Sequence, residues 1–188
     1  TEIFNPQNYK DRNENLLAPV EGSNVEAGIK SQWLDGRFTA NAAVFEAKQD
    51  NYAVRDASVP DGSLSDGSSA YIGINGTKAR GWEMDLNGEI LPGWTVNAGF
   101  THVKVTRAAT DLLYANLPED FLQLNTSVRL RGAWERLTLG GGVQWQSKVQ
   151  GFNVPYPPGG TVTVNQPAYS LVQFNANYRI SDSWTATL

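Results

Sequence analysis

Residues 121–131 read Phe-Leu-Gln-Leu-Asn-Thr-Ser-Val-Arg-Leu-Arg, and apolar and polar side chains alternate through this stretch. The even positions carry Leu122, Leu124, Thr126, Val128 and Leu130, and the odd positions after Phe121 carry Gln123, Asn125, Ser127, Arg129 and Arg131. Successive side chains of a β-strand point to opposite faces of its sheet. The stretch therefore predicts a strand with one apolar and one polar face, and about ten residues suffice for a tilted strand to cross a bilayer.

The same alternation recurs along most of the chain. Trp82 and Met84 interleave with Glu83 and Asp85, and comparable patterns run through residues 136–149 and 168–180. We expect strands at 23–34, 37–50, 71–90, 94–107, 121–131, 136–149 and 168–180, with an eighth strand opening at Trp184. The predicted fold class is all-β.

The connections between these strands are alternately short and long. Short turns are expected at 34–37, 91–93, 131–136 and 181–183, and long polar loops at about 51–70, 108–120 and 150–167. Outer-membrane barrels keep short turns on the periplasmic side and long loops outside. The rhythm therefore predicts antiparallel transmembrane strands whose long loops face the exterior.

The aromatic residues gather at two levels of the expected strands. Those close to a short turn are Trp33, Phe38, Trp94 and Trp184, and those six to ten residues further along are Trp82, Phe100, Phe121, Trp145 and Tyr169. At about 3.3 Å per residue and a tilt of about 40°, the two levels lie roughly 15 to 25 Å apart. This pattern is typical of two aromatic girdles. We expect Trp33, Phe38, Trp82, Trp94, Trp145 and Trp184 to form a membrane girdle facing lipid.

Composition limits the function without identifying it. The 188 residues include no cysteine, carry a net charge of −4, have a mean hydropathy of −0.38 and contain one histidine. A disulfide framework and thiolate metal sites are excluded, and the mild acidity argues against a nucleic-acid partner. His102 stands without an evident catalytic partner, and Glu83, Asp85 and Glu89 are interpreted as part of a hydrated wall. We predict neither an enzyme nor a protein metal site.

Several motifs resemble a known family. They are the stretch at 3–7, the pattern of Leu17-Ala18-Pro19 with residues 22–30, the hairpin from Arg80-Gly81-Trp82-Glu83 to Pro92-Gly93-Trp94, and the glycine-rich 139–147. Together they resemble the ferric-siderophore branch of the TonB-dependent outer-membrane receptors, which includes the ferripyoverdine, ferrichrome and coprogen receptors. The resemblance covers nearly the whole chain, and Val25 departs from it where the branch usually has tyrosine.

The resemblance implies a 22-stranded barrel filled by a plug domain, of which this chain supplies about eight strands. Residues 1–188 would be a partial receptor barrel domain in the bacterial outer membrane, with the plug and the final strands absent. The receptor would bind a ferric siderophore and import it with energy delivered by TonB through the plug. No resident cofactor is implied, because the siderophore itself coordinates the iron.

Ligand recognition is expected in the long loops and the wall beside them, because loops on a rigid scaffold carry binding. The candidates are Tyr52, Arg55, Tyr71, Arg80, Tyr114, Phe152 and Tyr156. Aromatic faces and arginine forks suit flat, polar and anionic groups. Two alternatives stay open from the sequence: a passive outer-membrane porin, and a soluble carbohydrate-binding β-sandwich.

Overall fold

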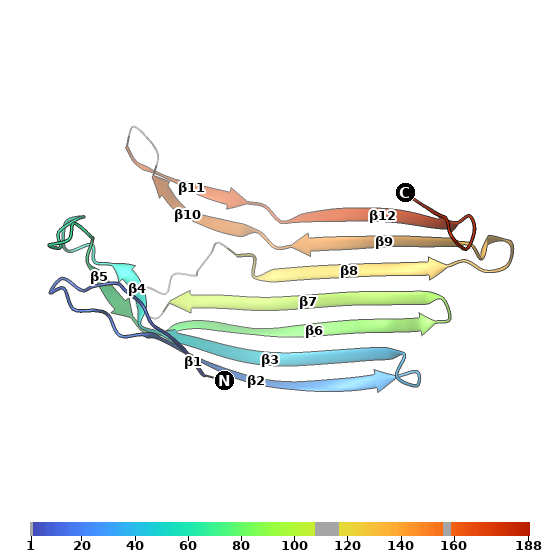
Figure 1. Ribbon diagram of the computed structural model, residues 1–188, viewed down its shortest axis with the longest axis horizontal. Helices are drawn as coiled ribbons and strands as arrows, with labels where there is room; N and C mark the ends of the chain where they lie inside the picture. Colours follow the sequence, from blue (N-terminus) through green and yellow to red (C-terminus); the bar gives the residue numbers. More distant parts are fainter. Residues whose placement is uncertain (1, 108–116, 156–158) are drawn as a thin grey trace. The chain divides into compact units, whose positions relative to one another are not determined.

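The computed structural model describes residues 2–107, 117–155 and 159–188 as an assembly of antiparallel strands (Figure 1). The strands are β1 (Glu2–Asn5), β2 (Val20–Trp33), β3 (Phe38–Asp50), β4 (Tyr52–Arg55), β5 (Tyr71–Ile74), β6 (Thr77–Leu91), β7 (Trp94–Arg107), β8 (Asp120–Arg129), β9 (Leu137–Gln146), β10 (Val149–Pro155), β11 (Thr161–Gln166), β12 (Tyr169–Arg179) and β13 (Thr185–Thr187). A short 3₁₀ helix, η1 (Gly132–Trp134), lies between β8 and β9. No helix in the described part of the chain is long and apolar enough to cross a membrane.

Nine strands form one sheet in the order β1-β2-β3-β6-β7-β8-β9-β12-β13. The predicted all-β fold and the alternation of short and long connections are confirmed. β2–β3, β6–β7, β8–β9 and β12–β13 are joined by short turns, and β3–β6, β7–β8 and β9–β12 by long connections.

Local sequence explains the tightest turns. Asp35 and Gly36 have φ values of 57° and 81°, and the Arg37 amide donates to the Leu34 carbonyl at 3.2 Å. Positive φ at both central residues is the mark of a type I′ hairpin, for which Asp-Gly is a favoured pair. Pro92 and Gly93, with φ of 83° at the glycine, join β6 to β7 by the Pro-Gly pattern of a type II turn.

Two sequence expectations about strands are wrong in detail. The strand expected at 71–90 is divided into β5 and β6, which belong to different sheets. The break lies at Gly76, whose φ is 81° and whose amide donates to the Asp50 carboxylate at 2.6 Å. The connections expected as plain loops contain two-stranded sheets, β4–β5 and β10–β11, and β1 was not expected at all.

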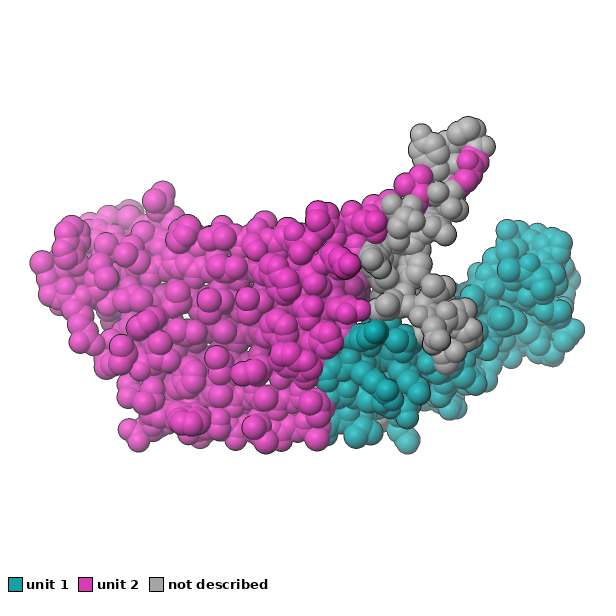
Figure 2. Space-filling model, turned by 180° about the vertical axis from the view of Figure 1, so that it is seen from behind, with its two compact units in different colours: residues 1–26, 45–81, 104–114 teal, residues 27–44, 82–103, 115–188 magenta. Residues whose placement is uncertain are grey.

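The chain divides into two compact units (Figure 2). Unit 1 comprises residues 1–26, 45–81 and 104–114, and unit 2 comprises residues 27–44, 82–103 and 115–188. Unit 1 contains β1, β4, β5 and the 6–19 connection, whereas unit 2 contains β8, β9, β12 and the short turns.

Register in unit 2 separates an apolar face from a polar face. Ala98, Leu124, Val143 and Val172 form one row of directly paired residues, while Asn97, Asn125, Gly142 and Gln173 form the neighbouring row. Phe121 and Tyr169 both pair with Gln146, next to Trp145, so they lie at the expected level along the strands but on the polar face.

The apolar face has no protein core packed against it. Among the described residues, the buried apolar side chains are Leu64 and Ala70, both in unit 1, whereas Phe174 is 84% exposed and Val172 59% exposed. A soluble β-sandwich would bury this face under a second sheet. The exposed apolar surface is the one that a membrane barrel presents to lipid.

Trp94 and Trp82, two members of the predicted girdle, lie on or next to this face. Trp94 pairs with Val128, and its indole nitrogen donates to the Thr126 hydroxyl at 2.8 Å. Trp82 stacks on Phe100 with ring centroids 4.9 Å apart. Further exposed or partly exposed members are Trp33, Phe38, Trp145 and Trp184. Their contact with lipid stays a prediction.

The glycines of β9 allow side chains to meet across that strand. Gln173 of β12 donates from Nε2 to Oδ1 of Asn125 in β8 at 3.0 Å, passing over Gly142. A Cβ at Gly142 would come within 2.8 Å of the Gln173 amide nitrogen. The glycine-rich stretch therefore serves close approach on the polar face.

Candidate functional site

The candidate binding surface lies in unit 1, where the 6–19 connection meets the β4–β5 hairpin. Tyr52 pairs with Ile74 and Arg55 pairs with Tyr71, so two predicted aromatic residues and one arginine stand on the same small sheet. The loop joining these strands, residues 56–70, is named here the β4–β5 loop.

The β4–β5 loop folds around a buried carboxylate. Asp56 is 4% exposed, and its amide donates to the Ala70 carbonyl at 2.9 Å, which closes the base of the loop. The Asp56 carboxylate accepts hydrogen bonds from the Ser58 amide and hydroxyl at 3.0 and 2.5 Å. Leu64 and Ala70 of the same loop are also buried, so the loop has buried side chains of its own.

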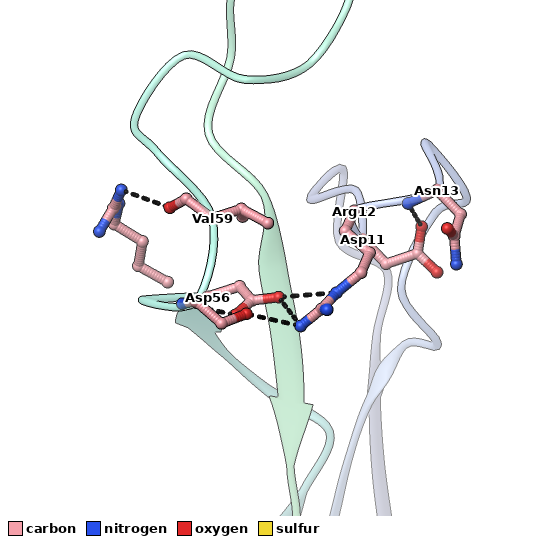
Figure 3. A network of polar contacts seen from close by, with 7 residues as sticks. Asp11, Arg12, Asn13, Asp56 and Val59 are labelled. Carbon is pink, nitrogen blue, oxygen red and sulfur yellow. Dashed lines mark hydrogen bonds and ion pairs between the residues drawn. The ribbon is translucent and has the colours of Figure 1, made fainter.

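Arg12 of the 6–19 connection completes this network (Figure 3). Its Nε and Nη2 donate to Asp56 Oδ2 at 3.1 and 2.6 Å, and Nη2 also reaches the Ser58 hydroxyl at 2.7 Å. Asp11 holds the turn by accepting from the amides of Asn13 and Asn15 at 2.8 and 2.9 Å. The turn therefore places the guanidinium on the buried carboxylate.

Two further contacts join the same segments. Lys10 Nζ lies 2.7 Å from Asp66 Oδ2, and the Ser65 amide donates to the Glu14 carboxylate at 2.8 Å. Together with Arg12–Asp56, they form what we call the loop latch. The loop latch fixes the 6–19 connection to the β4–β5 loop.

These contacts favour the ionised carboxylates. The pKa of Asp66 is lowered chiefly by the Lys10 ammonium and the Ser68 hydroxyl, and the pKa of Asp56 is lowered by Ser58 and then by Arg12. The Ser65 hydrogen bond likewise lowers the pKa of Glu14. The Lys10 pKa is raised by its pairing with Asp66.

An open cavity of about 600 Å³ lies beside the latch. It is lined by Tyr9 and Tyr52 and by Asn5, Pro6, Gln7, Asn8, Val20, Gln49 and Ala53. Tyr9 also packs against Tyr71, with ring centroids 4.4 Å apart, and the Tyr71 amide donates to the Lys10 carbonyl at 2.8 Å. Tyrosine rings and carboxamides in one concavity suit a flat, polar ligand.

The structure brings three of the predicted site residues together around the β4–β5 hairpin. The fourth described residue, Arg80, lies in β6 and contacts β3 instead. Tyr52 lines the cavity, Tyr71 contacts Tyr9, and Arg55 pairs with Asp61 and donates to the Val59 carbonyl at 3.2 Å. Arg80 pairs with Glu46 of β3. Tyr114 and Tyr156 lie outside the described residues, and Phe152 belongs to β10 with its side chain outside the described part.

Sequence reasoning missed the contribution of the 6–19 connection. Tyr9, Lys10 and Arg12 lie more than 40 residues before their partners, so no local period links them. The charged run at 10–14 between Pro6 and Pro19 was the available signal.

The residues considered for catalysis do not assemble into a catalytic set in the described chain. His102 has a partner that the sequence did not reveal. Its Nδ1 lies 2.6 Å from Asp120 Oδ1, and its ring lies beside that of Trp82. Glu89 accepts from the Gly93 amide at 2.5 Å and supports the turn. Within residues 2–107, 117–155 and 159–188, no three His, Cys, Asp or Glu side chains gather as a metal site.

Comparison with known proteins gives one consistent family. Residues 1–188 match the family described as TonB dependent receptor-like, beta-barrel. The chain is 39% identical over 189 residues to the ferric-pyoverdine 358 receptor of Pseudomonas putida, and 37% identical over 191 residues to the ferripyoverdine receptor of Pseudomonas aeruginosa. All of the chain is aligned in both cases, but it spans only 22% and 23% of those receptors.

Solved structures agree with this match. The pyoverdine outer membrane receptor of Pseudomonas aeruginosa bound to pyoverdine superposes with a TM-score of 0.92 at 38% identity, over the whole chain and 28% of the receptor. The alcaligin outer membrane receptor of Bordetella pertussis superposes with a TM-score of 0.78 at 32% identity, over the whole chain and 30% of that receptor.

Proposed function

Because the chain belongs to the TonB-dependent receptor β-barrel family, we propose that it forms part of the wall and outer loops of a receptor that imports a ferric siderophore. Its place is the bacterial outer membrane. TonB would supply the energy through a plug domain. Iron enters as cargo inside the siderophore, so the proposed role needs neither catalysis nor a resident cofactor.

The whole-chain similarity to ferripyoverdine receptors carries this proposal. The chain spans about a quarter of those receptors, so transport by the complete protein is inferred from the family. Pyoverdine-type ferric siderophores are the first ligand class to test.

The surface in unit 1 supports ligand binding by its chemistry. Tyr9 and Tyr52 line one cavity, and Tyr71 packs against Tyr9 at its side. Aromatic rings give large contact areas at a low cost in side-chain entropy, and their hydroxyls accept and donate hydrogen bonds. We assign Tyr9, Tyr52 and Tyr71 to the siderophore-binding surface, with Arg55 at its margin.

The two alternatives lack comparable support. A passive porin is disfavoured by the family match, and a soluble sandwich is disfavoured by the uncovered apolar face of unit 2.

The test is direct binding of ferric pyoverdine to the full-length receptor. Tyr9→Ala and Tyr52→Ala should each weaken binding by about three- to tenfold, the range expected when one aromatic contact is lost. Tyr178→Ala is the matched control, because this exposed tyrosine lies at the short-turn end of β12. Unchanged affinity in both Tyr9→Ala and Tyr52→Ala would place siderophore recognition elsewhere. If neither the unaltered receptor nor any variant, Tyr178→Ala included, bound ferric pyoverdine, pyoverdine-type siderophores would be excluded as the ligand class.

A further inference from the structure

Two asparagines of the chain are followed directly by glycine, and they lie in different settings. Asn75-Gly76 joins β5 to β6, and Asn87-Gly88 lies inside β6. An asparagine in this pair is open to attack on its side-chain carbonyl carbon by the backbone nitrogen of the next residue, because glycine has no side chain to hinder the approach. Both pairs share this chemistry, so their surroundings decide how fast each one reacts.

A carboxylate lies on the attacking nitrogen of the first pair. The Gly76 amide donates to Asp50 Oδ1 at 2.6 Å, and Asp50 is the last residue of β3. A group that accepts a hydrogen bond from a reacting N–H at this distance is positioned to take its proton. Asp50 therefore stands where the reaction needs a general base.

A backbone N–H meets the carbonyl that would be attacked. The Asn51 amide donates to Asn75 Oδ1 at 2.8 Å. Negative charge develops on this oxygen when a nitrogen adds to the side-chain carbon, and a donor already in place at about 2.7 to 3.1 Å stabilises that charge. Asn51 is itself held, since its side chain donates to the Pro19 carbonyl at 3.1 Å. The donor is thus fixed before any reaction begins.

The second pair has different surroundings. The Asn87 carbonyl accepts from the Thr39 hydroxyl at 3.2 Å, and Gly88 lies directly against the Arg37 carbonyl. Among the residues that the structure describes, the Gly76 amide is hydrogen-bonded to a carboxylate and the Gly88 amide is not. Pairing within β6 also restrains the rotation that ring closure requires. Asn87-Gly88 therefore serves as an internal reference for the first pair.

We propose that Asn75-Gly76 is a site of self-catalysed deamidation, with Asp50 as the general base and the Asn51 amide as the donor to the oxyanion. The Gly76 nitrogen gives its proton to Asp50 and bonds to Cγ of Asn75, which closes a five-membered ring. The side-chain nitrogen then leaves as ammonia and takes the proton back from Asp50. Water opens the resulting succinimide at either carbonyl, so position 75 becomes aspartate or isoaspartate.

The product alters the junction at which it forms. Tyr52 pairs with Ile74, next to the reacting residue, at the base of the β4–β5 hairpin. Aspartate at position 75 adds a negative charge close to the Asp50 carboxylate, and isoaspartate adds an atom to the backbone. Either change weakens the base of the hairpin, so the hairpin loosens as the receptor ages. This modification does not depend on which ligand the receptor imports.

The experiment incubates the full-length receptor, folded in phosphatidylcholine bilayer discs, at neutral pH. Peptide mass spectrometry follows the replacement of each side-chain amide by an acid. Asn75 should convert at least about tenfold faster than Asn87 in the folded receptor, because only its setting supplies the base and the oxyanion donor. In receptor unfolded by denaturant, the two asparagines should convert at similar rates.

Variants at position 50 test the general base. Asp50→Asn should slow the conversion of Asn75 about tenfold, and Asp50→Glu, which keeps the carboxylate, should restore part of the rate. Glu21→Gln is the matched control, because Glu21 lines the same concavity as Asp50 and the change removes the same charge. It should leave the rate at Asn75 unchanged. Heat-modifiable migration on gels confirms that each variant is a folded barrel.

The sign of the Asp50→Asn effect separates catalysis from a purely structural role. If Asp50 only fastened the junction, its loss would free the backbone at Asn75 and speed deamidation. A faster or an unchanged rate in Asp50→Asn would therefore overturn the proposal. Conversion of Asn75 no faster than that of Asn87 in the folded, unaltered receptor would also overturn it, and this comparison needs no variant.

Discussion

Leu124→Arg tests which face of unit 2 meets lipid. Leu124 is 37% exposed and shares its row with Ala98 and Val143, all apolar. Its neighbour Gln123 points to the opposite face, where its register partners are Gly99 and Gln144. The pair Leu124→Arg and Gln123→Arg therefore introduces the same side chain at adjacent positions on opposite faces.

The expected magnitude depends on depth. Leu124 lies four residues from Val128, the partner of Trp94, and two residues from Leu122, the partner of Trp145. At about 3.3 Å per residue and a tilt of about 40°, the Leu124 Cα lies roughly 10 Å from the lower aromatic level and 5 Å from the upper one. This depth predicts a cost of about 2 to 3 kcal/mol for Leu124→Arg. Gln123→Arg should cost less than about 0.5 kcal/mol, because a polar surface position beside a glycine can hold a longer side chain.

The assay is reversible denaturant unfolding of the full-length receptor in phosphatidylcholine vesicles, followed by tryptophan fluorescence. Leu124→Ala separates the lost apolar contact from the added charge, and it should account for the smaller part of the change. A cost for Gln123→Arg equal to or greater than that for Leu124→Arg would refute the assignment of the two faces.

Further predictions concern the loop latch, two glycines and the β10–β11 hairpin. Because the pKa values of Asp56, Asp66 and Glu14 are lowered, the loop latch is at full strength above the ordinary values of 3.8 to 4.5, weakens below them, and is lost as pH falls through the lowered values. The protection factors of the amides of residues 9–17, each referred to the intrinsic exchange rate at the same pH, should therefore be smaller at pH 3 than at pH 7, and equal protection factors would contradict this prediction. Gly142→Ala should cost about 1 to 2 kcal/mol by separating Gln173 from Asn125, and an unchanged unfolding midpoint would show that the strands accommodate the methyl group. Gly88→Ala should lower the free energy of unfolding by about 3 kcal/mol. The φ of Gly88 is 141°, and a Cβ there would overlap the Arg37 carbonyl and lie 2.7 Å from Phe38 Cα. A variant barrel as stable as the unaltered one would exclude this close approach. Deleting residues 151–163 should sharply weaken ferric pyoverdine binding while the barrel stays heat-stable, and unchanged affinity would exclude this hairpin from recognition.

The features that sequence predicted best are those specified locally. Alternation along residues 121–131 predicted the two faces of β8, and Asp35-Gly36 and Pro92-Gly93 predicted tight turns, because period and turn chemistry involve residues a few positions apart. The family resemblance rested on the same local motifs and is confirmed.

Features that depend on distant contacts were missed. The alternation that includes Ile72 and Ile74 of β5 runs into β6 without a change of period. The break between the two strands is seen only in the contact of the Asp50 carboxylate with the Gly76 amide. The level of Phe121 and Tyr169 along their strands was predicted, but the face on which they lie follows from their pairing with Gln146. The partners of Arg12 and Lys10 are likewise set by the folded loops.

The loop latch has a consequence for exchanging loops between receptors. Residues 56–70 cannot be exchanged alone, because the cation that pairs with the buried Asp56 is Arg12, which lies in a separate part of the chain. A chimera that transplants only the β4–β5 loop would inherit an acidic group without its cation, whereas one that also carries residues 9–17 would transfer both halves. Natural variants should show the same coupling, with a change of sign at position 12 accompanied by a change at position 56.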